Sequence, residues 1–124
     1  MKSKGEIREA IDEFLKLIEE YQDALVIVEG KEDKSALIKL GFTNIITLST
    51  PLYKVVESVK TKKVIVLTDL DSEGKKLYSK LKHELGQRGV YIDDKLRNLL
   101  FKTDLRQLEG LFTYLSKFNN EQDI

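Results

Sequence analysis

Three acidic residues stand at the ends of two apolar runs, and their types and spacing suit the binding of a divalent cation. Glu29 follows the run ALVIV, and Asp69 and Asp71 follow the run VIVLT that begins at Val64. Carboxylate oxygens are the ligands that hard cations such as Mg²⁺ and Mn²⁺ prefer. Without a cation, carboxylates held close together repel one another, and some of their pKa values rise. The three acids therefore predict an all-oxygen metal site, provided that the fold brings them together.

Small and basic residues lie beside both acidic segments. Gly30 and Gly74 allow the backbone to come close to a ligand, and the amides at the helix starts that follow are expected to face an anion. Four lysines flank the acids and are candidates for phosphate contacts: Lys31, Lys34, Lys75 and Lys76. A cation at such a site orients phosphate oxygens, neutralises phosphoryl charge and lowers the pKa of a bound water.

A purely structural reading of the same residues stays open for each segment taken alone. Asp71 and Ser72 can cap the helix that follows them, and Glu29 can be a solvated loop acid. That both segments end an apolar run in the same alternating chain favours the site over this reading.

The elements that position the acids follow from the pattern of apolar residues. Spacings of three and four predict helices over 6–21, 31–40, 51–59, 72–85, 93–101 and 104–118. Short apolar runs predict strands over 24–28, 44–48 and 64–68, with a short fourth at 89–92. Alternation of this kind predicts a parallel sheet with helices on both faces, in which ligands bind beyond the carboxyl ends of the strands.

Local signals predict where several helices begin and end. Gly41 and Gly86 are expected to end their helices, and Ser49 or Thr50 to cap the helix whose first turn holds Pro51. His83 is expected on the surface. Leucines recur along the last two helices, where they serve either as core or as a partner surface: Leu96, Leu99, Leu100, Leu105, Leu108, Leu111 and Leu115.

Composition excludes several classes of site. The 124 residues include 21 Lys and Arg and 21 Asp and Glu, so the formal net charge is zero and no broad basic surface is expected. With no cysteine and one histidine, thiolate and multi-histidine metal sites are excluded within one chain. No apolar run reaches the roughly 20 residues that span a bilayer. The start of the chain lacks the apolar core of a signal peptide, so we expect a cytoplasmic protein.

The two acidic segments resemble the Toprim domain, which is shared by type IA and type II topoisomerases, bacterial primases, the ribonuclease that matures 5S ribosomal RNA, and old-type nucleases. The family signature is a Glu-Gly pair after the first strand and an Asp-x-Asp pair after the third. The segment VIVEGKEDKSAL (26–37) resembles the first part, and VIVLTDLDSEGKKL (64–77) resembles the second. The resemblance covers about residues 24–92, and the run Asp-x-Asp-x-Glu-Gly is most similar to the type IA topoisomerase version.

The resemblance implies a three-layer α/β fold around a roughly four-stranded parallel sheet, with residues 1–124 as a single Toprim domain and a helical C-terminal end at 93–118. It implies Mg²⁺, or Mn²⁺, held by Asp69 and Asp71, with Glu73 and Glu29 as further metal-binding residues. Glu29 would act as general acid/base in nucleotidyl transfer or strand cleavage.

The chain is similar to the stand-alone small Toprim proteins, which leaves the function open. The first hypothesis is a metal-dependent nuclease or phosphotransferase that acts on RNA or DNA. The alternatives are a non-catalytic module that binds a nucleic acid or a nucleotide through the metal, a subunit of a larger nucleic-acid-processing complex, and a metal-regulated interaction protein.

Overall fold

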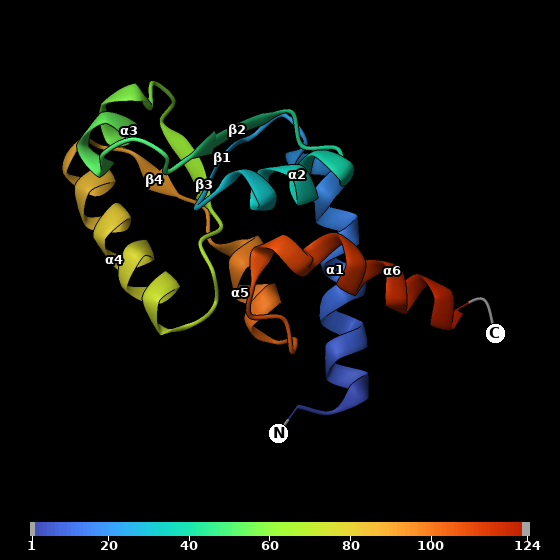
Figure 1. The fold of residues 1–124 in the computed structure, drawn as a ribbon. Coiled ribbons are helices and arrows are strands. Elements are labelled where there is room, and N and C mark those ends of the chain that lie inside the picture. The colour runs from blue at the N-terminus through green and yellow to red at the C-terminus, as the bar shows by residue number, and fades with distance from the viewer. Residues whose placement is uncertain (1, 123–124) are drawn as a thin grey trace.

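Four parallel strands and six α-helices make up the computed structural model, which describes residues 2–122, and of residues 119–122 only the backbone (Figure 1). The strands are β1 (Leu25–Val28), β2 (Asn44–Thr47), β3 (Lys63–Val66) and β4 (Tyr91–Ile92). The helices are α1 (Lys4–Tyr21), α2 (Lys31–Lys39), α3 (Leu52–Ser58), α4 (Ser72–Gln87), α5 (Lys95–Phe101) and α6 (Leu111–Gln122), with a 3₁₀ turn η1 (Leu108–Gly110) before the last. The predicted α/β class with a four-stranded parallel sheet is confirmed.

The sheet order is β2-β1-β3-β4, so the two strands that carry the acids are neighbours. Val26 pairs with Ile45 of β2 on one side and with Ile65 of β3 on the other. Parallel neighbours end at the same edge of a sheet, so the residues after β1 and β3 emerge side by side.

Alternate side chains of the strands enter two separate cores, one on each face of the sheet. On one face, Val26 and Ile65 pack with residues of α1, α2, α5 and α6. On the other face, Ile27 and Val66 pack with residues of α3 and α4. The C-terminal leucines named above are all buried, which identifies them as core residues rather than a partner surface.

Some predicted boundaries are wrong for identifiable reasons. The helix α4 ends at Gln87, close to Gly86 as predicted, although the left-handed residue that follows it is Gly89, with φ of 76°. Neither Ser49 nor Thr50 caps α3, whose N-cap is Pro51 without a side-chain hydrogen bond. Gly41, with φ of 102°, directly follows the C-cap residue of α2, as predicted.

The predicted helix 104–118 is wrong over its first part. Residues 102–107 are not helical, and α6 begins only at Leu111. The backbone of this segment has partners elsewhere, since the carbonyl of Arg106 accepts the N–H of Leu70 at 2.8 Å. Tertiary bonding to the loop after β3 therefore replaces the local helix that the leucine spacing indicated.

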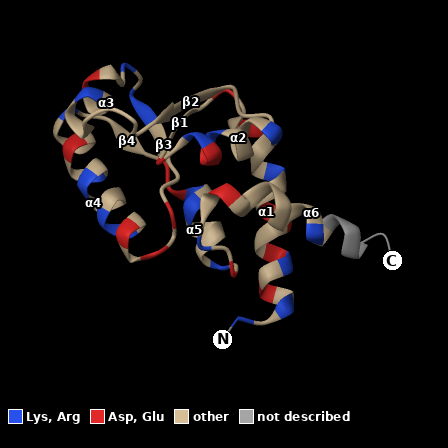
Figure 2. Ribbon diagram, viewed as in Figure 1, with Lys and Arg blue, Asp and Glu red and all other residues tan. Residues whose placement is uncertain are grey.

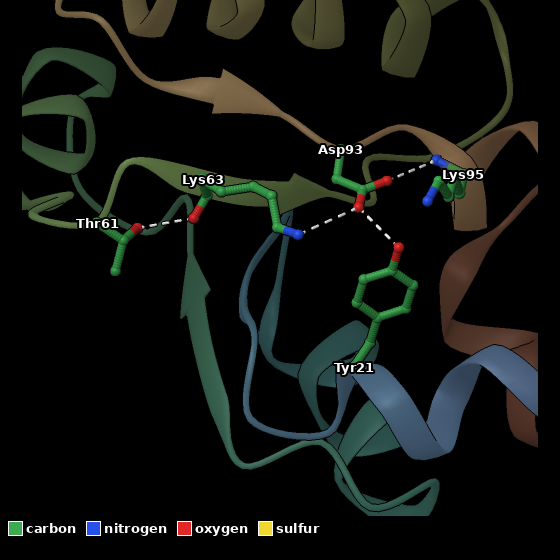
Figure 3. Close-up of polar contacts among 5 residues, drawn as sticks. All are labelled: Tyr21, Thr61, Lys63, Asp93 and Lys95. Atoms are coloured by element: carbon green, nitrogen blue, oxygen red, sulfur yellow. Dashed lines mark hydrogen bonds and ion pairs between the residues drawn. The ribbon is translucent and has the colours of Figure 1, made fainter.

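A buried polar group fixes α5 and α1 to the sheet (Figure 3). Asp93, 5% exposed, follows β4 and accepts hydrogen bonds from the Tyr21 hydroxyl at 2.7 Å and the Lys95 N–H at 3.1 Å. The Lys63 ammonium lies 3.7 Å from the same carboxylate. Burial raises the pKa of the Tyr21 hydroxyl to about 12, and the Asp93 carboxylate adds to the rise. The group joins the end of α1, the start of β3 and the start of α5.

A search of the described residues finds no helix that is both long enough and apolar enough to cross a bilayer.

Candidate active site

Glu29 and Asp69 meet at the carboxyl ends of β1 and β3. Glu29 is the first residue after β1, and its Oε2 accepts the backbone N–H of Asp69 at 2.7 Å. The Leu67 N–H donates to the Ile27 carbonyl at 2.8 Å, which extends the strand pairing to the acids. The two segments that the sequence placed on one edge therefore touch each other.

Two buried side chains donate hydrogen bonds to the backbone of the segment that carries the aspartates. The buried Thr68 hydroxyl donates to the Gly74 carbonyl at 2.7 Å, and the buried Arg97 guanidinium donates to the carbonyls of Thr68 and Asp69. At Gly74 an added Cβ would lie 1.8 Å from the Asp69 carbonyl oxygen, so only glycine fits. Gly74 thus serves close packing of α4 on this loop.

Asp71 is both a member of the acidic motif and the N-cap of α4. Its Oδ1 accepts the Gly74 N–H at 2.8 Å, and its Oδ2 accepts from Gln107 Nε2 at 2.8 Å. These two bonds hold the pKa of the Asp71 carboxyl below its usual value. The capping interpretation is thus confirmed for Asp71, and it coexists with a place beside the other acids.

Two contributors to the site come from the C-terminal segment, and the sequence analysis did not identify them. Gln107 bonds to Asp71, and the Leu108 N–H donates to Asp69 Oδ1 at 2.8 Å. A backbone amide leaves no trace in the sequence, and nothing local marks Gln107 as different from the other glutamines. Both contacts exist only because residues 102–107 cross back over the loop after β3.

Glu29 and Asp69 line a pocket of about 380 Å³, which we call the acidic pocket, whereas Asp71 is not part of its lining. Figure 2 shows acidic residues at the start of α2 and in the loop before α4, and Glu109 belongs to η1. Among the described residues Lys31 is the one basic member of the lining, which consists of Glu29, Gly30, Lys31, Glu32, Asp33, Asp69, Gln107 and Glu109. The pKa values of two of these carboxyls, Glu29 and Asp33, are raised. Burial raises the pKa of Glu29, the Asp69 carboxylate raises it further, and the Asp69 N–H opposes the rise. Burial likewise raises the pKa of Asp33.

The residues expected to contact phosphate do not lie together in the structure. Gly30 and Gly74 do not offer their amides to an anion, because the Gly30 N–H donates to Asp33 Oδ2 at 3.0 Å and the Gly74 N–H to Asp71. One amide at each helix start is thus occupied by an acid of the same segment, and the role of these residues in phosphate binding stays a prediction.

The four lysines go to different places. Lys31 lines the acidic pocket, Lys75 lies over the Phe101 ring, and Lys34 is exposed. Lys76 pairs with Glu73 at 3.4 Å, and both side chains are exposed. Glu73 is therefore turned to solvent.

The donor set fits a magnesium ion that keeps much of its water. Among the residues whose side chains the structure describes, no group of three or more His, Asp or Glu side chains is placed to hold a metal ion, so Glu29, Asp69 and Asp71 do not form a ready-made three-carboxylate site. Mg²⁺ is usually held by one or two carboxylates and several waters, and ligating carboxylates commonly accept hydrogen bonds as well. Glu29 and Asp69 each commit one oxygen to a backbone N–H and line one pocket. A carboxylate offers about four acceptor positions, so Asp71 also keeps the capacity to bind a cation.

Comparison with known proteins assigns the family. The family model described as the Toprim domain matches residues 24–98, more than half of the chain. The chain belongs to the Toprim family. A UPF0292 protein of Methanocaldococcus jannaschii is 35% identical over 121 residues, which cover 88% of this chain and 94% of that protein.

Two further similar proteins are a solved structure and a DNA primase. A solved structure of a protein from Aquifex aeolicus is 37% identical, with a TM-score of 0.69 over 82% of this chain and 94% of that one. The DNA primase DnaG of Aeropyrum pernix is 37% identical over 75 residues, which cover 57% of this chain and 17% of the primase. Toprim domains generally bind Mg²⁺, and Toprim relatives act on nucleic acids. The residues that bind to the two aspartates from the C-terminal segment lie beyond the family match.

Proposed function

We propose that this Toprim protein carries out Mg²⁺- or Mn²⁺-dependent phosphodiester chemistry on a nucleic acid, as a nuclease or a nucleotidyl or phosphoryl transferase. The observation that carries the proposal is the meeting of the two acidic segments: the backbone nitrogen of Asp69 lies 2.7 Å from Glu29 Oε2, and both residues line one pocket. The similarity to a DNA primase supports a nucleic acid as the substrate class.

The proposal gives the acids different roles. Asp69 and Asp71 would hold the cation. When bound, the cation would neutralise charge on the phosphoryl oxygens and lower the pKa of a bound water. Glu29 would act as general acid/base, a role for which a carboxyl with a raised pKa is suited. A ligand role for Glu73 requires its side chain to turn away from Lys76.

Neutralising single acids tests this function. We expect Glu29→Gln and Asp69→Asn each to lower the rate of metal-dependent cleavage by about 100-fold or more, because general acid–base groups contribute roughly 10²–10⁴-fold. Purified protein is incubated with labelled structured RNA and single-stranded DNA, with Mg²⁺ or Mn²⁺ and with EDTA. Glu57→Gln removes an exposed carboxylate of α3 as the matched control and leaves the rate unchanged. Cleavage that Asp69→Asn leaves undiminished would reject the proposal.

A second function, metal-dependent binding without turnover, is favoured by one observation. Each of the three motif carboxylates already has a hydrogen-bond partner within the protein, so the site is satisfied without chemistry. In that case oligonucleotide binding requires Mg²⁺, and no product accumulates. Binding that survives EDTA unchanged counts against this alternative.

Both functions predict that Mg²⁺ raises the melting temperature, because a cation that binds only the folded state stabilises it by mass action. Asp69→Asn reduces that gain. The same variant leaves the metal-free protein as stable as before, or more stable, because one repelling charge is removed. A melting curve that does not respond to millimolar Mg²⁺ would contradict the metal site itself.

A further inference from the structure

A second pocket, of about 240 Å³, lies between α4 and α5 and has the opposite charge. Three of its residues are cations and one, Asp94, is an anion. Its lining consists of Lys75, Tyr78, Ser79, Lys82, Asp94, Arg97, Asn98 and Phe101. In a protein with zero formal net charge, this is a local excess of positive charge rather than part of a basic surface. We call this pocket the basic groove.

Two facing helical stripes form the basic groove. Residues 75, 78, 79 and 82 of α4 follow the spacing i, i+3, i+4, i+7, and so do residues 94, 97, 98 and 101 at α5. The Lys75 ammonium lies 5.4 Å from the Phe101 ring centre, and the Arg97 guanidinium lies 4.5 Å from that of Tyr78. The stripes therefore run antiparallel, with Lys75 and Phe101 at one end and Lys82 and Asp94 at the other.

One end of the basic groove adjoins the acid-bearing loop. Arg97, at the floor, donates to the carbonyls of Thr68 and Asp69, so the guanidinium that lines the groove also holds the backbone of an acidic-motif residue. Lys75 belongs to the same first turn of α4 that Asp71 caps, and its N–H donates to the Asp71 carbonyl at 3.0 Å. A chain lying in the groove thus approaches the acids at the Lys75 end.

We propose that the basic groove binds one strand of a nucleic acid through its phosphates and leads that strand to the acids. The destination rests on the proposed function. A pocket of this volume is smaller than the roughly 300–1,000 Å³ of sites that enclose a small ligand, so it fits a length of polymer backbone better than a free nucleotide. Positive grooves that track the backbone, with aromatic side chains at hand, are typical of sites for single strands.

The two exposed lysines are the groups that meet the phosphates. Lys75 and Lys82 are seven residues apart on α4, a distance of about 10.5 Å along the helix axis, so they reach different phosphates of one strand. Arg97 is 2% exposed and already donates to two backbone carbonyls. It therefore shapes the groove and holds the loop, and it does not contact the phosphates of the bound strand. Asn98, exposed on the opposite stripe, adds an uncharged donor.

Fluorescence anisotropy tests the groove with a labelled 12-nucleotide mixed-sequence DNA, its RNA counterpart and the matching duplex. Measurements in EDTA separate strand binding from metal chemistry. We expect Lys82→Ala to weaken single-strand binding about fivefold or more, and to lower the slope of log affinity against log salt by about 0.7, the value for one phosphate contact on a single strand. Lys80→Ala removes an exposed lysine from the opposite side of the same helix, outside the pocket lining, and should leave both quantities unchanged.

The outcomes distinguish this inference from the proposed function. If the Asp69→Asn variant has lost cleavage but still binds the single strand in EDTA, the result supports the groove. Wild-type binding in EDTA, together with no cleavage when Mg²⁺ or Mn²⁺ is added, also supports the groove and counts against the catalytic function. Equal losses in Lys80→Ala and Lys82→Ala, tighter binding of the duplex than of the single strand, equal binding of polyglutamate, or no binding at low salt would each overturn the groove.

Discussion

Two pockets on either side of one loop carry opposite charge. The acidic pocket has five carboxylates and one lysine, whereas the basic groove has three cations and one carboxylate. A formal net charge of zero therefore conceals a separation of charge over a short distance. Under our proposals the acidic pocket takes the cation and the basic groove takes the polyanion, so that neither ligand lies beside protein charges of its own sign.

The two pockets also differ in how the fold makes them. The acidic pocket joins the ends of β1 and β3 to the C-terminal segment, through contacts between residues far apart in the chain, such as Leu108 with Asp69. The basic groove is formed by facing residues of α4 and α5, the helices that precede and follow β4 in the sequence. The acidic pocket is therefore sensitive to the path of the backbone, and the groove to the docking of α5.

The largest expected effect comes from the loop that the pockets share. We expect Gly74→Ala to destabilise the protein by about 3 kcal/mol or more, because overpacking against backbone costs about 1–3 kcal/mol and the Cβ would lie 1.8 Å from the Asp69 carbonyl oxygen. Urea unfolding measures the loss. The matched control is Gly86→Ala on the same helix, where nothing lies within 4 Å, and we expect it to stabilise by about 0.5–1 kcal/mol. Equal effects at the two glycines would contradict the close packing.

Arg97 connects the two pockets, so its replacement should affect both. Arg97→Lys cannot donate to the carbonyls of Thr68 and Asp69 with the same fork, and we expect a loss of about 2–3 kcal/mol, typical of hydrogen bonds from charged groups. The Mg²⁺-induced rise in melting temperature and the affinity for the single strand should fall together. Arg88→Lys, at an exposed site, is the control. A fall in one property alone would show that the pockets are independent.

Tyr21→Phe should affect the basic groove more than the acidic pocket, because Tyr21 bonds to Asp93 at the start of α5. We expect a loss of about 2 kcal/mol at neutral pH. Burial acts to raise the pKa of Asp93, but the hydrogen bonds from Tyr21 and the Lys95 N–H, together with the charge of Lys63, outweigh it and lower that pKa. The stabilisation is thus present above the unfolded pKa of Asp93 and is lost as the pH falls through the lowered value.

The Tyr21 side of the pair sets the alkaline limit. Its pKa rises from 10.0 to about 12, so the stabilisation is complete below pH 10 and disappears as the pH rises towards 12. Unfolding of wild type and Tyr21→Phe, measured from pH 3 to 11, should differ most between about pH 5 and 9. Tyr53→Phe, at a residue 60% exposed, is the control. A difference that does not vary with pH would contradict the charged hydrogen bond.

The smallest effect is expected at Gln107, which lines the acidic pocket but not the basic groove and donates a hydrogen bond to Asp71 Oδ2. Without its bond to Asp71 Oδ2, the pKa of Asp71 should rise towards its ordinary value, and Mg²⁺ affinity should fall about tenfold, as for other groups that orient metal ligands. Carboxyl NMR titration and calorimetry measure the two. Gln87→Ala, at an exposed glutamine at the end of α4, should change neither. Unchanged single-strand binding in Gln107→Ala would sharpen the distinction between the pockets.

Much of the frame could be predicted because the signals are local. The apolar runs before Glu29 and before the Asp69–Asp71 pair indicated buried parallel strands, and the strand ends placed these acids on one edge. The positions at which helices begin and end were harder to predict. Gly86 and Gly89 both suit a helix end, and only the positive φ of Gly89 distinguishes them. The leucine spacing after Asp104 indicated a helix, but the bond from Leu70 N–H to the Arg106 carbonyl outweighs that local preference.

The sequence by itself determined the alternating α/β order, the identity of the acids and the family to which they belong, because periodicity and strand ends are properties of neighbouring residues. Only the tertiary structure decided which groups support those acids. Leu108 contributes an amide, Arg97 a guanidinium directed at two carbonyls, and Gln107 a bond to a residue 36 positions away. The basic groove has the same origin, since two stripes of ordinary surface residues become a site only when α4 and α5 are docked side by side.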